Sequence, residues 1–213
     1  VSPFLGLDLN LHPARRRHSE GQRSRFGVSV MPRGRHGRYF PRMLSRHQAL
    51  NLLRKYRLTD RRIQHSVAVA TFAFDMACRI RSRHPDLPVD PQKVKIAALL
   101  HDIGREQEGD HELNSMEILR REGLPELADI VSHGSIYEIM KLRGSDRPDL
   151  LPHSLENKLV AYADARVRLA PVSLRQRVDD LISRRGDDTE KVQSAEMAME
   201  RFERMENELR ELL

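Results

Sequence analysis

Helix-forming and helix-ending signals follow one another from Ser45 to the end of the chain, and they constrain the fold more than any other feature. Apolar residues recur at steps of three and four, the spacing that places side chains on one face of an α-helix. Ser, Thr or Asp precedes most of these segments as an N-cap, and Gly follows several. No segment alternates apolar and polar residues, so no strand is predicted. The chain is predicted to be all-α, with helices over about 45–56, 60–82, 91–100, 113–122, 125–132, 154–169, 173–186 and 189–212.

The composition predicts a cytoplasmic protein with an aliphatic core. Aromatic residues make up 5% of the chain and Trp is absent, so Leu, Ile, Val, Ala and Met must fill the core. The single cysteine, Cys78, excludes an internal disulfide, which fits a reducing compartment. The longest apolar run, residues 67–74, is far shorter than the roughly 18 residues that suggest a membrane span. Residues 1–11 lack the charge pattern of a secretory signal, so no membrane contact is expected.

The positive charge of the chain is concentrated in residues 1–42. Nine of the 37 basic residues and two of the 31 acidic residues lie there, which leaves 28 basic and 29 acidic residues in the nearly neutral remainder. This Arg-rich segment mixes Gly, Pro, Ser and His without periodicity, as disordered segments do. An electrostatic tether to nucleic acid or anionic lipid is one interpretation. Aromatic residues do not alternate with the arginines as a base-stacking surface requires, which favours a solvated arm instead.

Ionisable residues interrupt the most apolar parts of three predicted helices. His65 lies one turn before the apolar stripe of the second helix, so it should point inward. His101 and Asp102 directly follow the apolar end of the third helix. Asp164, four residues after Val160, lies on the inward face of a helix that is apolar almost all round. Two imidazoles and two carboxylates are therefore expected inside the bundle.

A divalent metal ion is the simplest partner for these four side chains. A buried carboxylate without a partner costs roughly several kcal/mol, so it must find a cation or lose its charge. Each residue alone could be a hydrogen-bonded core histidine, a helix cap or an ion-paired aspartate; the joint pattern favours metal binding. Imidazole mixed with carboxylate suits Fe, Mn, Co or Zn, and Mg is also considered. We expect one or two such ions.

The order of His65, the Ala-Ala-Leu-Leu-His-Asp-Ile-Gly segment at 97–104 and Tyr-Ala-Asp at 162–164 resembles the HD-domain superfamily of metal-dependent phosphohydrolases. The resemblance extends over about residues 45–182. It implies a helical bundle with the metal at its centre and the hydrolysis of a phosphoester or phosphoanhydride, of a nucleotide in the first instance, by a metal-activated water. It further implies that Asp102 both binds metal and orients that water.

Two more histidines match positions that complete a second metal site in dinuclear members of this superfamily. His111 follows Asp102 by nine residues, and His133 follows the predicted 125–132 helix. The resemblance implies that Asp102 bridges two ions, that His65, His101 and Asp164 bind one, and that His111 and His133 bind the other. The alternative is that these two histidines only start and end helices, where a protonated His after a C-terminus interacts well with the helix dipole.

The arrangement is similar to that of the bacterial symmetrical diadenosine tetraphosphate hydrolases but departs from it after His133. The chain continues as Gly-Ser-Ile-Tyr and carries a longer insert through residue 151, expected to be a charged loop, so the resemblance does not carry the diadenosine substrate. Several subgroups have a Lys after the His-Asp-Ile-Gly motif that touches phosphate. Here Arg105 stands in that position and is a candidate catalytic residue that binds phosphate without donating a proton. The insert supplies weaker candidates for cations at the phosphate: Lys141, Arg143 and Arg147.

The chain is expected to divide into the arm at 1–42, an HD domain at 43–186 and a C-terminal helix at 187–213. The apolar stripe of that last helix could pack on the bundle or pair two chains into a homodimer. Two other functions remain open from the sequence. One is a degenerate HD module that binds a nucleotide or a protein partner, which the intact ligand set disfavours. The other is an HD-fold di-iron oxygenase, in which the same six ligands would serve.

Overall fold

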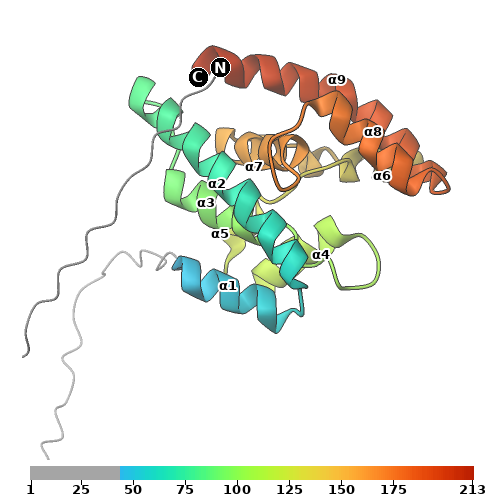
Figure 1. Ribbon diagram of the computed structural model, residues 1–213, viewed down its shortest axis with the longest axis horizontal. Helices are drawn as coiled ribbons and strands as arrows, with labels where there is room; N and C mark the ends of the chain where they lie inside the picture. Colours follow the sequence, from blue (N-terminus) through green and yellow to red (C-terminus); the bar gives the residue numbers. More distant parts are fainter. Residues whose placement is uncertain (1–43) are drawn as a thin grey trace, which may run out of the picture. The chain divides into compact units, whose positions relative to one another are not determined.

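The computed structural model describes residues 44–213, and within them the structure is helical without strands (Figure 1). The predicted all-α class is confirmed, whereas the predicted arm lies outside the described residues. Val167 and Pro171 form one isolated bridge. The helices are α1 (Arg46–Lys55), α2 (Asp60–Arg83), α3 (Pro91–Leu100), α4 (His111–Arg121), α5 (Pro125–Ala128), α6 (Ile136–Leu142), a 3-10 helix η1 (Pro148–Leu150), α7 (Leu155–Arg166), α8 (Leu174–Arg185) and α9 (Thr189–Leu212).

The capping residues that the sequence indicates are the ones that start the helices. Ser45 and Ser173 each form a capping box with the glutamine three residues later. Thr59, Asp90 and Ser154 accept hydrogen bonds from the first-turn backbone of α2, α3 and α7. Because these bonds satisfy backbone groups that the helix itself leaves unpaired, they locate the helix starts within a residue or two.

Three helix boundaries differ from the prediction, and α6 and η1 were not predicted. α4 begins two residues earlier than expected, α5 ends at Ala128 and α7 ends at Arg166, where the chain becomes extended at Val167. The insert contains α6, with Ile136 and Ile139 buried. The sequence did not predict this helix because Glu138 lies on its buried side. An acidic residue in a short segment is normally interpreted as facing solvent.

Helices α2, α3 and α7 pack together and surround the centre of the domain. The exposed fraction is at most 5% for every residue from Ile96 to Leu100 on α3 and from Leu159 to Ala163 on α7. A helix that is buried on nearly all sides must be apolar on nearly all sides, which explains why these two segments show little amphipathic periodicity. Any polar side chain at their ends is therefore held inside the protein.

Helix α9 packs against α6, α7 and α8 and buries Ala198, Phe202, Met205 and Leu209 (Figure 1). An internal ion pair accompanies this apolar contact: Arg201 Nε and Nη2 donate to the two carboxylate oxygens of Glu138 on α6, each at 2.9 Å. The apolar stripe of the last helix is thus covered by the bundle along much of its length. None of the described helices is long and apolar enough to cross a membrane.

Candidate metal centre

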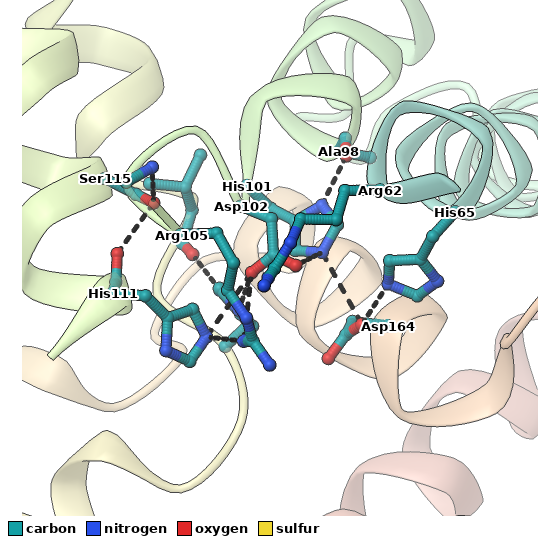
Figure 2. Close-up of polar contacts among 12 residues, drawn as sticks. Arg62, His65, Ala98, His101, Asp102, Arg105, His111, Ser115 and Asp164 are labelled. Atoms are coloured by element: carbon teal, nitrogen blue, oxygen red, sulfur yellow. Dashed lines mark hydrogen bonds and ion pairs between the residues drawn. The ribbon is translucent and has the colours of Figure 1, made fainter. Parts of the chain in front are cut away.

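The six side chains predicted as ligands lie together between α2, α7, the start of α4 and the segments that follow α3 and α5. Figure 2 shows five of them directed toward one another, with Asp102 in the middle. Three overlapping triads have ligand atoms within 4.8 Å of one another. These are His65 with His101 and Asp102, His101 with His133 and Asp164, and Asp102 with His111 and His133. Residues up to 99 positions apart in sequence are therefore brought into one cluster.

The carboxylate of Asp102 faces two groups of imidazoles, one with each oxygen. Oδ2 lies 3.9 Å from His101 Nε2, whereas Oδ1 lies 3.3 Å from His111 Nε2 and 3.6 Å from His133 Nε2. Asp164 Oδ1 completes the first group, at 3.0 Å from His65 Nε2 and 3.5 Å from His101 Nε2. The cluster thus has two adjoining halves that share Asp102, and the triad of His101, His133 and Asp164 spans both.

Three of the imidazoles are oriented by main-chain carbonyl groups. The Nδ1 atoms of His65, His101 and His133 lie 2.7–2.8 Å from the carbonyl oxygens of Arg168, Ala98 and Val131. A carbonyl oxygen only accepts, so each Nδ1 carries the proton and donates it. In the neutral ring the Nε2 lone pair then points at the carboxylates. This arrangement, with one ring nitrogen held by a backbone acceptor and the other directed at a common point, is the one found around metal-binding histidines.

The Nε2 atom of His101 is buried and has no hydrogen-bond partner. Its ring is fully buried, and the nearest polar atoms are carboxylate oxygens of Asp102 and Asp164. A nitrogen lone pair and a carboxylate oxygen are both acceptors, so they repel each other unless a cation or a proton lies between them. The donor set, two carboxylates and four imidazoles, fits a divalent cation of the borderline class.

The close approach of α4 depends on Gly104. A Cβ atom at this position would lie 2.5 Å from the backbone nitrogen of Ser115 and 2.6 Å from Cβ of Asn114. Instead, Gly104 donates its N–H to Ser115 Oγ, at 2.9 Å, in the second turn of α4. The loop after His101 and Asp102 is thereby pressed against α4, and His111 at the first position of that helix reaches Asp102.

The electrostatic environment keeps both carboxylates ionised. Burial by itself would raise the pKa of Asp102, but His101, a hydrogen bond from His133 and the Arg105 guanidinium together hold the pKa well below its usual range. The pKa of Asp164 is likewise held well below its usual value, because the Arg177 guanidinium and the nearby imidazoles of His101 and His65 outweigh its burial. Both groups therefore present full negative charge at neutral pH.

The same environment shifts the pKa values of the imidazoles in opposite directions. Burial disfavours the cationic form of His133, but Glu112, Asp102 and Asp164 more than compensate and raise its pKa to about 10. The pKa of His65 is also raised: burial lowers it, and the hydrogen bond to Asp164 outweighs that effect. Burial dominates at His111 and lowers its pKa well below the usual value. The proton on His133 thus offsets part of the carboxylate charge in the absence of another cation.

Arg105 lies within the cluster, whereas the cations of the insert engage acidic residues elsewhere. Arg105 Nη1 is 3.4 Å from Asp102 Oδ1 and donates to His111 Nε2, and about a third of its side chain is exposed (Figure 2). Arg143 pairs with Glu190 and Asp110, and Arg147 pairs with Asp149. Lys141 lies over the ring of Tyr137. Of the four suggested phosphate-binding cations, Arg105 is the one that contacts the cluster.

Two further charged residues contact the cluster and were not predicted. Arg177 on α8 places Nη2 3.4 Å from Asp164 Oδ1. It lies three residues after Leu174 and four before Leu181, so its place on the apolar face of that helix was a detectable signal. Glu112 is 4% exposed, its Oε2 has no partner, and burial raises its pKa to about 7. Its position in the first turn of a polar segment gave no sign that it would be buried.

Comparison with known proteins gives relatives for most of the described chain. The HD domain family matches residues 62–169, half of the chain. An uncharacterized protein of Methanocaldococcus jannaschii is 31% identical over 145 residues, which cover 64% of this chain and 82% of that protein. A tRNA (cytidine(56)-2'-O)-methyltransferase of Picrophilus torridus is 30% identical over 160 residues, 71% of this chain and 45% of the enzyme. Ribonuclease Y of Thermosipho melanesiensis is 33% identical over 126 residues, 57% of this chain and 21% of the enzyme.

The chain spans less than half the length of the last two relatives. No solved structure gave a significant match. The matched segment begins three residues before His65 and ends five residues after Asp164, so it contains all six clustered side chains. On this match, and on its similarity to the Methanocaldococcus protein, the chain belongs to the HD domain family, within the superfamily of metal-dependent phosphohydrolases.

Proposed function

We propose that this protein is a metal-dependent phosphohydrolase that cleaves a phosphoester or phosphoanhydride bond in a small phosphorylated compound, most simply a nucleotide. The observation that carries the proposal is the orientation of the imidazoles. Three Nδ1 atoms donate to backbone carbonyls, so three Nε2 atoms face carboxylates, and His101 Nε2 has no other partner. A divalent cation between these atoms would satisfy all of them at once.

We assign His65, His101, Asp164 and Oδ2 of Asp102 to one ion, and His111, His133 and Oδ1 of Asp102 to a second. The distances from the two Asp102 oxygens to the two groups of imidazoles support this division. The ions would be Fe, Mn, Co, Zn or Mg. When bound, they would supply Lewis acidity, which acidifies water and neutralises charge on phosphoryl oxygens.

The chain's own residues supply the remaining functions. Asp102 lies between the two halves of the cluster and would accept a hydrogen bond from the attacking water and fix its direction. Arg105 contacts the same carboxylate from the exposed side, so its guanidinium is available to phosphate oxygens. A guanidinium does not release its proton in proteins, so Arg105 would stabilise charge and would not protonate the leaving group.

Metal analysis and phosphate release test the proposal on the full chain. Protein purified without chelators is analysed by mass spectrometry and then incubated with nucleotides, dinucleoside polyphosphates and short RNA, the last because relatives include ribonucleases. We expect near-stoichiometric or higher metal and phosphate release or RNA cleavage, both lost in His101→Ala. Protein that stays metal-free after addition of Mn²⁺ or Fe²⁺, yet binds a nucleotide, would identify a binding module instead. Oxygen consumption by a coloured protein would identify an oxygenase.

Metal binding is expected to release protons. Because the pKa of His133 is raised to about 10 and that of His65 is also raised, the metal-free cluster holds His133 protonated at pH 7. Imidazole binds metal in its neutral form, so the ion must displace that proton, and affinity should increase as pH rises toward the pKa of His133. Calorimetric titration of Mn²⁺ in two buffers of different ionisation enthalpy measures the number released.

We expect the release of at least about one proton per protein at pH 7, falling by about one in His133→Gln. Titration of Mn²⁺ into His153→Gln, which changes a histidine outside the cluster, provides the control. Release that is unaffected by His133→Gln would show that this residue does not take part.

A further inference from the structure

We propose that a cavity between α7, α8 and α9 is the subsite that receives the apolar part of a nucleotide, its base, while the phosphate lies at the metal centre. This inference rests on the proposed function and extends it, because it assigns the specificity of the reaction to helices α8 and α9. Both helices lie beyond residue 169, where the match to the HD domain family ends.

The cavity has a volume of about 90 Å³ and is partly open to solvent. Its walls are mainly aliphatic and small, with Ala165 from α7, Leu174 from α8, and Ala195, Ala198 and Phe202 from α9. An engineered apolar cavity of about 150 Å³ is large enough to bind benzene. A volume of 90 Å³ is smaller than that, so the cavity holds only part of a planar ring, and the polar edge of a base would lie toward the opening.

The packing of α8 reflects this cavity. The sequence places Leu174, Val178 and Leu181 on one apolar face, yet Leu174 alone is buried and the other two stay partly exposed. Apolar side chains that line unfilled space lose contacts which a packed neighbour would provide. A planar apolar group bound in the cavity would restore contacts to Val178 and to Phe202 across from it.

The cavity adjoins the metal centre through residues next to its ligands. Asp164 is itself part of the lining and is followed by Ala165, while Gly134 and Ser135 line the opposite side and directly follow His133. One residue, Asp164, is therefore common to the cavity and the ligand cluster.

One ion pair lies at this junction. Arg177 is the cation among the lining residues, and its Nη2 atom lies 3.4 Å from Asp164 Oδ1, with about a quarter of the side chain exposed. The Ser135 hydroxyl is engaged with Ser194, at 2.9 Å, so it leaves the rest of the wall apolar. The subsite thus combines a guanidinium at the end near the centre with an apolar interior, which matches a phosphate joined to a flat apolar ring.

The test compares adenosine 5′-monophosphate with ribose 5-phosphate, which is the same compound without the base. Binding to the metal-loaded full chain is measured by the shift in thermal midpoint, and turnover by phosphate release. We expect the wild type to prefer the nucleotide in both measurements. Ala195→Leu fills part of the cavity and should lower the ratio of nucleotide to ribose phosphate, in kcat/KM and in affinity, at least about tenfold.

Met197→Ala is the matched control, since Met197 lies on the same helix with its side chain exposed and outside the cavity. It should leave the ratio unchanged. Met199→Ala enlarges the cavity and serves as a second test variant if Ala195→Leu does not fold. It should also change the ratio of nucleotide to ribose phosphate.

The proposed subsite would be contradicted if the wild type bound and turned over the two compounds equally, or if neither cavity variant changed this ratio. Failure of the proposed function is distinct: it would leave the protein without turnover, while a preference for the nucleotide would remain in the thermal-shift measurement, which is carried out both with and without added metal.

Discussion

Asp102→Asn is expected to reduce phosphate release at least about 100-fold, the effect of removing one preorganised charged group from a reaction centre, and to lower metal content in both halves of the cluster. The amide has nearly the same shape as the carboxylate but carries no charge. Because each oxygen of Asp102 faces a different group of imidazoles, one substitution weakens both. Metal analysis and phosphate release are measured on the same sample.

His111→Ala should behave differently, since His111 contacts only the Oδ1 side of Asp102. If the wild type binds close to two ions, this variant should retain close to one. Asp129→Asn is the control, because Asp129 is exposed and pairs only with Arg120. Full activity in Asp102→Asn, or equal metal content in Asp102→Asn and wild type, would contradict the assignment of this carboxylate as the shared ligand.

Arg201→Met is expected to cause a large loss of stability, although Arg201 lies outside the cluster. The Arg201 side chain is 15% exposed, and its guanidinium makes a two-pronged ion pair with Glu138, whose side chain is 6% exposed. Removing one partner leaves Glu138 buried and unpaired, which costs about 3–5 kcal/mol in the free energy of unfolding. Urea unfolding monitored by circular dichroism measures this quantity.

The double variant Glu138→Leu with Arg201→Met should recover much of that loss, because an apolar pair leaves no charge unpaired. Arg204→Met, which removes an exposed partner of Glu200 on the same helix, should cost less than about 1 kcal/mol. If Arg201→Met and Arg204→Met were equally mild, the buried pair would not contribute as described.

The helical class and most helix starts could be predicted because they depend on local chemistry. The caps Ser45, Thr59 and Ser173 form hydrogen bonds within three residues of themselves, so the sequence contains the whole interaction. Helix ends depend more on distant contacts. α7 stops at Arg166, three residues before the predicted end, where the carbonyl of Arg168 receives the Nδ1 proton of His65 from α2. That partner is 103 residues away and leaves no local trace.

The candidate site divides in the same way. His65 and Asp164 could be predicted as site residues because a polar residue on an apolar helix face is buried and therefore requires a polar or charged partner. Arg177 likewise lies on the apolar face of its helix, so the sequence also indicated that it is directed inward. Glu112 and the contact between Arg105 and His111 could not be predicted, since they depend on how closely α4 approaches the loop after α3. The metal-binding role of the six residues stays a prediction until metal is measured.

The attachment of α9 to the turn after His133 has a consequence for biosynthesis. Gly134 accepts a hydrogen bond from Arg201, and Ser135 exchanges one with Ser194, so the last helix holds the backbone next to the cluster. A nascent chain that has emerged from the ribosome only as far as residue 186 already contains all six clustered side chains, but it lacks both of these anchors. The centre would therefore be completed only after α9 has been translated, which delays the capture of metal until that helix has packed against the turn after His133.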